Sequence, residues 1–132
     1  MAMDFSMKVL IVDDMRAMRS IVRGMLEEMG LMRIIEAEDG DSAWKIIQQS
    51  SLTPEDSLQL VIADWNMPGM SGVDLLRAVR GNASTRELPF LIITSEGTDM
   101  RISEAARAGA TEFIMKPFHG TQLTEKLNAI FA

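Results

Sequence analysis

Residues 60–76, with the sequence LVIADWNMPGMSGVDLL, contain the most informative pattern of the chain for its fold class. The segment opens with an uninterrupted apolar run, Leu60–Ala63, which predicts a short strand buried on both faces. Ser71 and Asp74 have the spacing of a capping box, so they predict the start of a helix that ends near Gly81. A buried strand followed by a short connection and a helix is the repeating unit of a parallel α/β sheet.

The same unit recurs along the whole chain. Further apolar runs predict three buried strands at Lys8–Val12, Phe90–Ile93 and Phe113–Met115, and the more mixed run Arg33–Ala37 predicts an edge strand. Apolar residues at helical spacing predict the other helices, which lie within Met15–Met29, Ala43–Ile47, Ile102–Ala106 and Leu123–Ile130. Strand and helix therefore alternate, and right-handed crossovers turn such a chain into a parallel sheet with helices on both faces.

Composition narrows the class of protein. The chain has 132 residues, of which 47% are hydrophobic and 24% charged, so we expect one globular domain over residues 1–132. It has no cysteine and one histidine, His119, which excludes thiolate metal sites, cysteine nucleophiles and sites built on several imidazoles. A net charge of −6 argues against a surface for nucleic acid or anionic membranes.

The sequence also indicates where in the cell the protein is expected to work. No apolar run approaches the roughly 20 residues that a membrane-spanning helix needs. The first residues, Met1–Met7, include neither a basic leader nor a long apolar stretch of the kind that a signal peptide has. We therefore expect a cytoplasmic protein without a membrane partner.

Polar residues follow the predicted buried strands. Asp13 and Asp14 follow the first strand, Asp64 the third, Thr94 the fourth and Lys116 the fifth. Because ligands of open parallel sheets bind at the carboxyl ends of the strands, we expect these side chains to meet in one site. Converging carboxylates repel one another, and one Mg²⁺ ion would relieve that repulsion. Asp64 is then a candidate nucleophile that forms an acyl phosphate, because both the metal and Lys116 can neutralise phosphoryl oxygens.

These residues resemble a known family, the receiver domains of two-component response regulators, and most closely its single-domain CheY-type chemotaxis members. The resemblance covers essentially the whole chain. It rests on Val12–Asp14 with Arg19 beyond, Ala63–Gly72, Ile93–Glu96, Ala108–Ala110 and Met115–Phe118, in order and at receiver-like spacing. It implies a flavodoxin-like fold with five parallel strands in the order 2-1-3-4-5.

The resemblance implies a role for each residue of the pocket. Asp64 is expected to be the phosphoacceptor. Asp13 and Asp14 are expected to hold Mg²⁺ together with Asp64 and the backbone carbonyl of Asn66. The phosphoryl donor is expected to be the phosphohistidine of a chemotaxis-type histidine kinase, for which small donors such as acetyl phosphate can substitute.

The resemblance also implies a switch. Thr94 and Lys116 are expected to respond to the phosphoryl group, Phe113 to swing inward as Thr94 moves, and the Lys116–Pro117 peptide bond to be cis. The partner face would then change its affinity for a target; its expected residues are Ile102, Phe113, Met115 and Lys126. Expected partners are the kinase and, further, a flagellar motor switch protein and a phosphatase, with the chain itself a monomer.

Two features distinguish this chain from motor-binding relatives, and a third concerns the lifetime of the phosphoryl group. The switch aromatic is Phe113 in a chain without tyrosine, and Asp99 lies near the start of the fourth predicted helix, where motor-binding relatives tend to be basic. Both put motor binding in question. Asn66 and Glu96 resemble the polar pair of fast-cycling members, so we expect fast loss of the phosphoryl group.

Alternatives remain open at this point. A phosphate sink without an output target would fit Phe113 and Asp99. A small aspartyl-nucleophile phosphatase is less favoured, because such enzymes need an acid or base two residues beyond the nucleophile and Asn66 stands there. We thus expect a regulator that assists its own phosphorylation, not an enzyme. Taken alone, Asp14 could simply cap the first helix.

Overall fold

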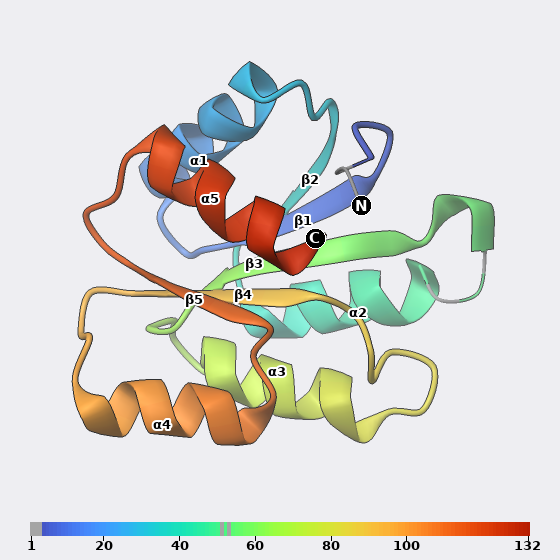
Figure 1. Cartoon of the computed structure of the whole chain (residues 1–132). Coiled ribbons are helices and arrows are strands. Elements are labelled where there is room, and N and C mark those ends of the chain that lie inside the picture. The colour runs from blue at the N-terminus through green and yellow to red at the C-terminus, as the bar shows by residue number, and fades with distance from the viewer. Residues whose placement is uncertain (1–3, 51, 53) are drawn as a thin grey trace.

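The computed structural model describes residues 4–50, 52 and 54–132. Within these residues, five parallel strands alternate with five α-helices (Figure 1). The strands are β1 (Lys8–Val12), β2 (Arg33–Ala37), β3 (Leu58–Asp64), β4 (Phe90–Thr94) and β5 (Glu112–Met115). The helices are α1 (Arg16–Glu28), α2 (Gly40–Ser50), α3 (Gly72–Gly81), α4 (Asp99–Ala108) and α5 (Gly120–Ile130). The strand order is β2-β1-β3-β4-β5, as the resemblance implied.

Alternating side chains of each strand enter two separate cores. On one face, Val9 and Ile11 of β1 pack with Val22 of α1 and Leu123 of α5. The other face is covered by α2, α3 and α4 (Figure 1). β1, β3 and β4 are nearly completely buried because both of their faces are covered, which explains why their sequences are continuous apolar runs.

Two sequence expectations about strands need correction. β3 and β4 extend further than their apolar runs, so Asp64 and Thr94 are the last residues of their strands and do not follow them. β5 was expected to be buried on both faces, but it is an edge strand in which only Ile114 is buried. Met115 is 47% exposed because no strand covers β5 on its outer side.

Capping residues in the sequence mark the start of α3 and both ends of α4. Ser71 Oγ accepts a hydrogen bond from the Asp74 amide at 3.1 Å, and an Asp74 carboxylate oxygen accepts one from the Ser71 amide at 3.4 Å, so the predicted capping box is confirmed. Thr98 caps α4 by accepting a hydrogen bond from the Arg101 amide at 3.2 Å. Gly109 ends that helix with φ +97°, a left-handed conformation that side chains with a Cβ rarely adopt.

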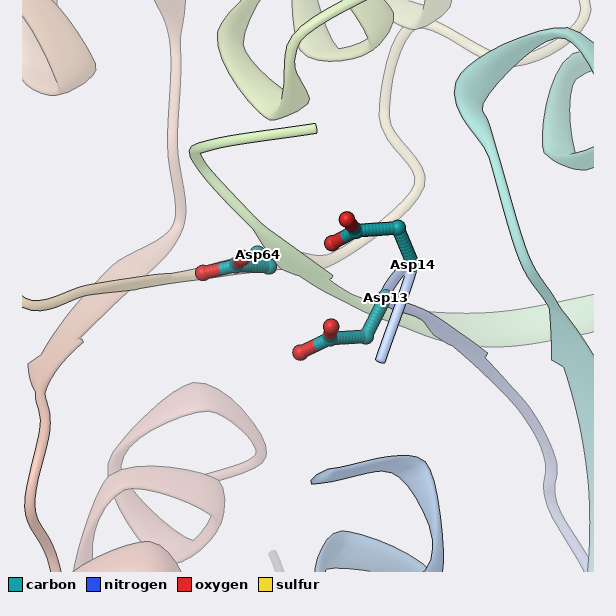
Figure 2. Close-up of side chains that lie close together, drawn as sticks. All are labelled: Asp13, Asp14 and Asp64. Carbon is teal, nitrogen blue, oxygen red and sulfur yellow. The ribbon is translucent and has the colours of Figure 1, made fainter. Parts of the chain in front are cut away.

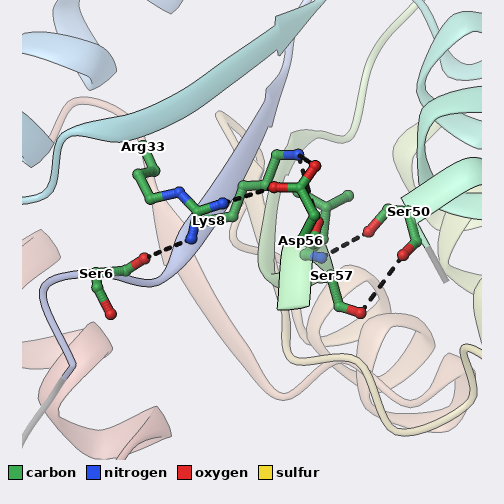
Figure 3. Close-up of polar contacts among 7 residues, drawn as sticks. Ser6, Lys8, Arg33, Ser50, Asp56 and Ser57 are labelled. Carbon is green, nitrogen blue, oxygen red and sulfur yellow. Dashed lines mark hydrogen bonds and ion pairs between the residues drawn. The ribbon is translucent and has the colours of Figure 1, made fainter. Parts of the chain in front are cut away.

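The amino-terminal ends of β1 and β2 are tied to the loop before β3. The Asp56 carboxylate forms ion pairs with Lys8 at 3.0 Å and with Arg33 at 2.6 Å (Figure 3). Ser50 Oγ accepts a hydrogen bond from the Leu58 amide at 2.6 Å, which joins the end of α2 to β3. The loop forms the short 3-10 turn Pro54–Asp56 and lies at the opposite end of β3 from Asp64.

Two sequence expectations fall partly outside the described residues. Met1–Met3, part of the stretch examined for a signal peptide, and Ser51 and Thr53, in the loop between α2 and β3, are not described. Among the residues that are described, no helix has the length and apolarity needed to cross a membrane.

Candidate functional site

Three carboxylates meet at the carboxyl ends of β1 and β3. One carboxylate oxygen from each of Asp13, Asp14 and Asp64 lies within 4.8 Å of the others (Figure 2). Asp13 and Asp64 are 2% and 5% exposed, while Asp14 lies on the surface. The cluster therefore has a buried floor and one solvent-facing member, as an open site for a charged ligand requires.

Lys116 supplies the one cation in contact with this cluster among the described residues. Its Nζ lies 3.1 Å from Oδ1 of Asp64 and 4.0 Å from Oδ2 of Asp13. The Lys116 amide donates to the carbonyl of Thr94 at 2.8 Å, and the peptide bond to Pro117 is cis, as the resemblance implied. Lys116 thus reaches across the end of β4 to the acid on β3.

Burial dominates the electrostatics of the two inner acids. It raises the pKa of Asp13, and the nearby charge of Asp64 adds to the rise, while the Met15 amide opposes it. Burial also raises the pKa of Asp64, with Lys116 opposing that rise. Three carboxylates against one ammonium leave an excess of negative charge, so a small divalent cation bound by oxygen ligands, such as Mg²⁺, fits this donor set.

The loop after β1 is held by hydrogen bonds that fix Asp13. Its Oδ1 accepts from the Met15 amide at 2.8 Å, and its carbonyl accepts from Arg19 Nη1 at 2.6 Å. Met15 is the N-cap of α1 and makes no side-chain cap. The carboxylate that bonds an amide at this helix start is therefore Asp13, and the alternative in which Asp14 caps α1 is wrong.

Thr94 ends β4 beside the site. Its side chain is fully buried, and its Oγ1 accepts a hydrogen bond from the Glu96 amide at 3.0 Å and lies 3.4 Å from the Glu96 carbonyl oxygen. Asn66 and Glu96 are both exposed, each two residues beyond a strand end. The structure thus places this polar pair on the surface, next to the residues that end β3 and β4.

Close backbone packing holds the loop after β3. The Gly72 amide donates to the Trp65 carbonyl at 2.9 Å, and a Cβ atom at Gly72 would overlap the Asp64 carbonyl oxygen. Only a residue without a side chain lets α3 start this near Asp64. In the sequence Gly72 lies within the capping box and ends the motif Ala63–Gly72, and neither pattern reveals its contact with the backbone of the candidate nucleophile.

The expected partner-face residues come from α4, β5 and α5. Ile102 and Met115 are 43% and 47% exposed. Phe113 is half-buried against the core under α4, and Lys126 pairs with Glu112 at 3.0 Å. α4 and α5 lie on opposite faces of the sheet with the edge strand β5 between them, so the three elements that carry these residues lie at the β5 edge of the sheet (Figure 1).

Two polar networks beside the site were not found in the sequence. Arg19 and Arg23 bond the two carboxylate oxygens of Glu36 on β2 at 3.0 and 2.7 Å. Arg101 of α4 lies over the ring of Trp65 and pairs with Glu96. The motif contained Arg19, Trp65 and Glu96, but each partner comes from another element, which no local pattern shows.

Comparisons with known proteins agree with this geometry. Residues 9–128 match the family described as the response regulator receiver domain. The chain is 41% identical to chemotaxis protein CheY of Pseudomonas aeruginosa over 95% of this chain and 96% of that protein. It is 42% identical to CheY-3 of Vibrio cholerae over 96% of this chain and 92% of that protein.

A solved structure extends the likeness to three dimensions. The structure of CheY4 of Vibrio cholerae superposes with a TM-score of 0.83 at 30% sequence identity and covers 95% of this chain and 98% of that one. The family match over residues 9–128 includes all three residues of the acidic cluster. The chain therefore belongs to the receiver domain family of response regulators, within its CheY-like branch.

Proposed function

We propose that this chain is a single-domain, phosphoryl-accepting response regulator in which Asp64 takes the phosphoryl group. The observation that carries the proposal is the 3.1 Å contact between Lys116 Nζ and Asp64 Oδ1 inside a cluster of three carboxylates. The ammonium contacts one carboxylate oxygen of Asp64 in the buried floor of the site. This arrangement suits a carboxylate nucleophile that must receive a charged phosphoryl group.

The proposed step is an in-line transfer. A carboxylate oxygen of Asp64 forms a bond to phosphorus while the phosphorus–nitrogen bond of a phosphohistidine breaks, and the electron pair of that bond returns to the imidazole of the donor. Asp13, Asp14, Asp64 and the backbone carbonyl of Asn66 would hold Mg²⁺, which would neutralise phosphoryl oxygens. Lys116 contributes a second positive charge at the acceptor and opposes the rise that burial causes in the pKa of Asp64.

The proposed switch begins at Thr94. Its hydroxyl now bonds the backbone of Glu96, and a phosphoryl group on Asp64 would offer it a charged acceptor instead. Movement of Thr94 would leave space that Phe113 can fill from its half-buried position in β5. Lys116 and Pro117 are the other two residues of the proposed switch.

The proposed partners follow from the CheY-like likeness. The donor would be a histidine kinase of the chemotaxis type, and the face that carries Ile102, Phe113, Met115 and Lys126 would bind the target. A flagellar motor switch protein and a phosphatase are the further proposed partners. We propose that the protein works as a monomer in the cytoplasm, and that Asn66 and Glu96 set the lifetime of the phosphoryl group.

A second candidate function, a phosphate sink without an output target, is favoured by two residues. Phe113 has no hydroxyl for a target to read, and Asp99 places an acid in the first turn of α4, beside the proposed output face. A phosphatase of the aspartyl-nucleophile class is not favoured, because the position two residues beyond Asp64 carries Asn66, which can neither donate nor accept a proton as an acid or base would.

The decisive experiment uses Trp65 as a reporter, because it follows Asp64 in the chain. Trp44, the other tryptophan, packs against the core of α2 and is replaced by phenylalanine to leave one signal. Mg²⁺ and then acetyl phosphate are added to Trp44→Phe and to Trp44→Phe/Asp64→Asn, and intact mass is recorded in parallel. We expect a response to Mg²⁺ in the first protein, and a donor-dependent fluorescence change and phosphoryl mass only where Asp64 is present.

The outcomes separate the candidates. Phosphoryl mass on the Asp64→Asn protein at the wild-type level would refute the acceptor assignment. Given labelling at Asp64, capture of the phosphorylated chain by a motor switch peptide above the unphosphorylated level would reject the phosphate sink. Capture of neither form would favour the sink.

A further inference from the structure

Arg101 of α4 contacts both Trp65, in the loop after β3, and Glu96, in the loop after β4. Its guanidinium carbon lies 4.4 Å from the centroid of the Trp65 ring, and Nη2 lies 3.5 Å from Oε2 of Glu96. Thr98 fixes the start of this turn by accepting a hydrogen bond from the Arg101 amide. The Arg101 side chain is 23% exposed, so it is mostly covered although its partner Glu96 faces solvent.

The placement of this arginine is costly. Nη1 is buried and has no hydrogen-bond partner within the part of the chain that the structure describes. A buried donor without an acceptor opposes folding, and the aromatic ring beneath the guanidinium offsets only part of that cost. A long apolar side chain would cover Trp65 without the unpaired donor. Stability alone therefore does not explain an arginine at this position.

Each residue that Arg101 contacts is in turn linked to a proposed functional residue, Trp65 to Asp64 and Glu96 to Thr94. Trp65 directly follows Asp64, the proposed acceptor, and its amide donates to the Ile93 carbonyl at 2.8 Å. Glu96 gives its amide to the hydroxyl of Thr94 at 3.0 Å. The Glu96 side chain is 55% exposed, and in the described residues its ion pair with Arg101 is the one contact that fixes it.

We propose that Arg101 is a positioning residue for loss of the phosphoryl group from Asp64. It holds the Glu96 carboxylate at the Trp65 side of the pocket and balances its charge, so that water reaches phosphorus without meeting a free anion. The inference rests on the proposed function and adds a residue to it. In the hydrolytic step, the water oxygen forms a bond to phosphorus, the acyl phosphorus–oxygen bond breaks with its electrons going to the Asp64 carboxylate, and the proton goes to solvent.

Removal of Arg101 frees Glu96 beside a phosphoryl group that carries negative charge. Repulsion between the two raises the barrier for water attack, and at separations of several ångströms this corresponds to a roughly three- to ten-fold slower hydrolysis. The effect passes through the Glu96 charge, so it must disappear when that charge is absent. This dependence distinguishes a positioning role from a merely structural one.

The test is a double-mutant cycle on decay of the phosphoprotein. Wild type, Arg101→Gln, Glu96→Gln and the double variant are phosphorylated with acetyl phosphate, freed of donor and followed by intact mass at fixed Mg²⁺. We expect Arg101→Gln to slow decay about three- to ten-fold in the wild-type background. In the Glu96→Gln background the same change should alter decay by less than about two-fold.

Two further variants keep the test decisive. Arg101→Met retains a long side chain over Trp65 and guards against loss of packing; it should slow decay as Arg101→Gln does. Arg107→Gln removes an exposed arginine from the same helix and controls for net charge. It should leave decay unchanged, and circular dichroism melts verify that every variant is folded.

Several outcomes would overturn the inference. Normal labelling with unchanged decay in Arg101→Gln and Arg101→Met would refute it while leaving the proposed function intact. Equal slowing in both Glu96 backgrounds, or faster decay without Arg101, would also refute it. Absence of label on wild-type Asp64 would instead refute the proposed function, and this inference with it.

Discussion

Lys116 Nζ and Asp64 Oδ1 lie 3.1 Å apart although Asp64 ends β3, Lys116 follows β5, and β4 lies between these two strands. The same ammonium is 4.0 Å from Asp13, so one flexible cation is shared between the proposed acceptor and a proposed metal ligand. A group bound at Asp64 must therefore compete with Asp64 and Asp13 for this lysine. That competition makes Lys116 suited to report the state of the acceptor to β5 and the elements beside it.

Lys116→Arg should permit phosphorylation and uncouple it from the output face. The guanidinium keeps the positive charge, but it is planar and larger than an ammonium and cannot follow the phosphoryl group in the same way. We expect phosphoryl mass on Asp64 in both proteins, with a change in amide hydrogen exchange of α4 and β5 only in wild type. A normal exchange response in the labelled variant would contradict this role. Lys45→Arg, at an exposed position of α2, serves as the control.

Asp13→Asn should affect stability and metal affinity in opposite directions. Burial raises the pKa of Asp13, so its ionised form is disfavoured in the folded protein, and its contribution to stability falls as pH rises above the usual range of an aspartate. The neutral amide removes that cost and can still accept from Met15. We expect a Tm at pH 7 a few degrees higher without Mg²⁺ and at least about ten-fold weaker Mg²⁺ binding. A lower Tm in metal-free buffer would contradict the argument.

Gly72→Ala should disturb the acceptor through the backbone. The added Cβ overlaps the Asp64 carbonyl oxygen and lies 3.1 Å from the Trp65 Cα, neither of which can turn aside as a side chain can. We expect destabilisation of about 1–3 kcal/mol in urea unfolding, together with slower phosphorylation by acetyl phosphate. Gly24→Ala is the matched control, because a Cβ there meets nothing within 4 Å in the middle of α1. It should stabilise by about 0.5–1 kcal/mol.

Glu36→Gln should lower stability in a pH-dependent way. Hydrogen bonds from Arg23 first, and from Arg19 as well, hold the pKa of Glu36 below its usual value of 4.5. A depressed carboxyl pKa stabilises the fold above the unfolded-state value and loses that effect as pH falls through the lower, folded-state value. We expect the variant to be less stable by about 1 kcal/mol at pH 7, with the difference shrinking below pH ~4.5. An equal difference at both pH values would show that the charge is not involved.

Much of this protein was readable from local sequence. The continuous apolar runs of β1, β3 and β4 predicted strands covered on both sides, and these strands are buried on both faces. Ser71 and Asp74 predicted the start of α3 to the residue. Such predictions succeed because strand burial and helix capping depend on residues within a few positions of one another.

The edge strand β5 and the ends of β3 and β4 were predicted less well from the sequence. Phe113–Met115 is as apolar as a central strand, but its exposure depends on whether another strand lies beside it, and the local run contains no information about that neighbour. The ends of β3 and β4 were also misplaced by the polar Asp64 and Thr94. Pairing with neighbouring strands extends β3 through Asp64, a residue type that strands disfavour, and β4 through Thr94, which is polar but β-branched and suits a strand.

The local sequence was enough to predict that a parallel sheet brings Asp13, Asp14, Asp64, Thr94 and Lys116 to one edge, because strand direction fixes which end of each strand faces the site. The side-chain partners around that edge could be read only from the folded chain. Arg101 meets Trp65 across 36 positions of chain, and Arg23 meets Glu36 across 13. Such contacts depend on how the helices pack on the finished sheet, and packing geometry is a property of the whole fold that no single segment encodes.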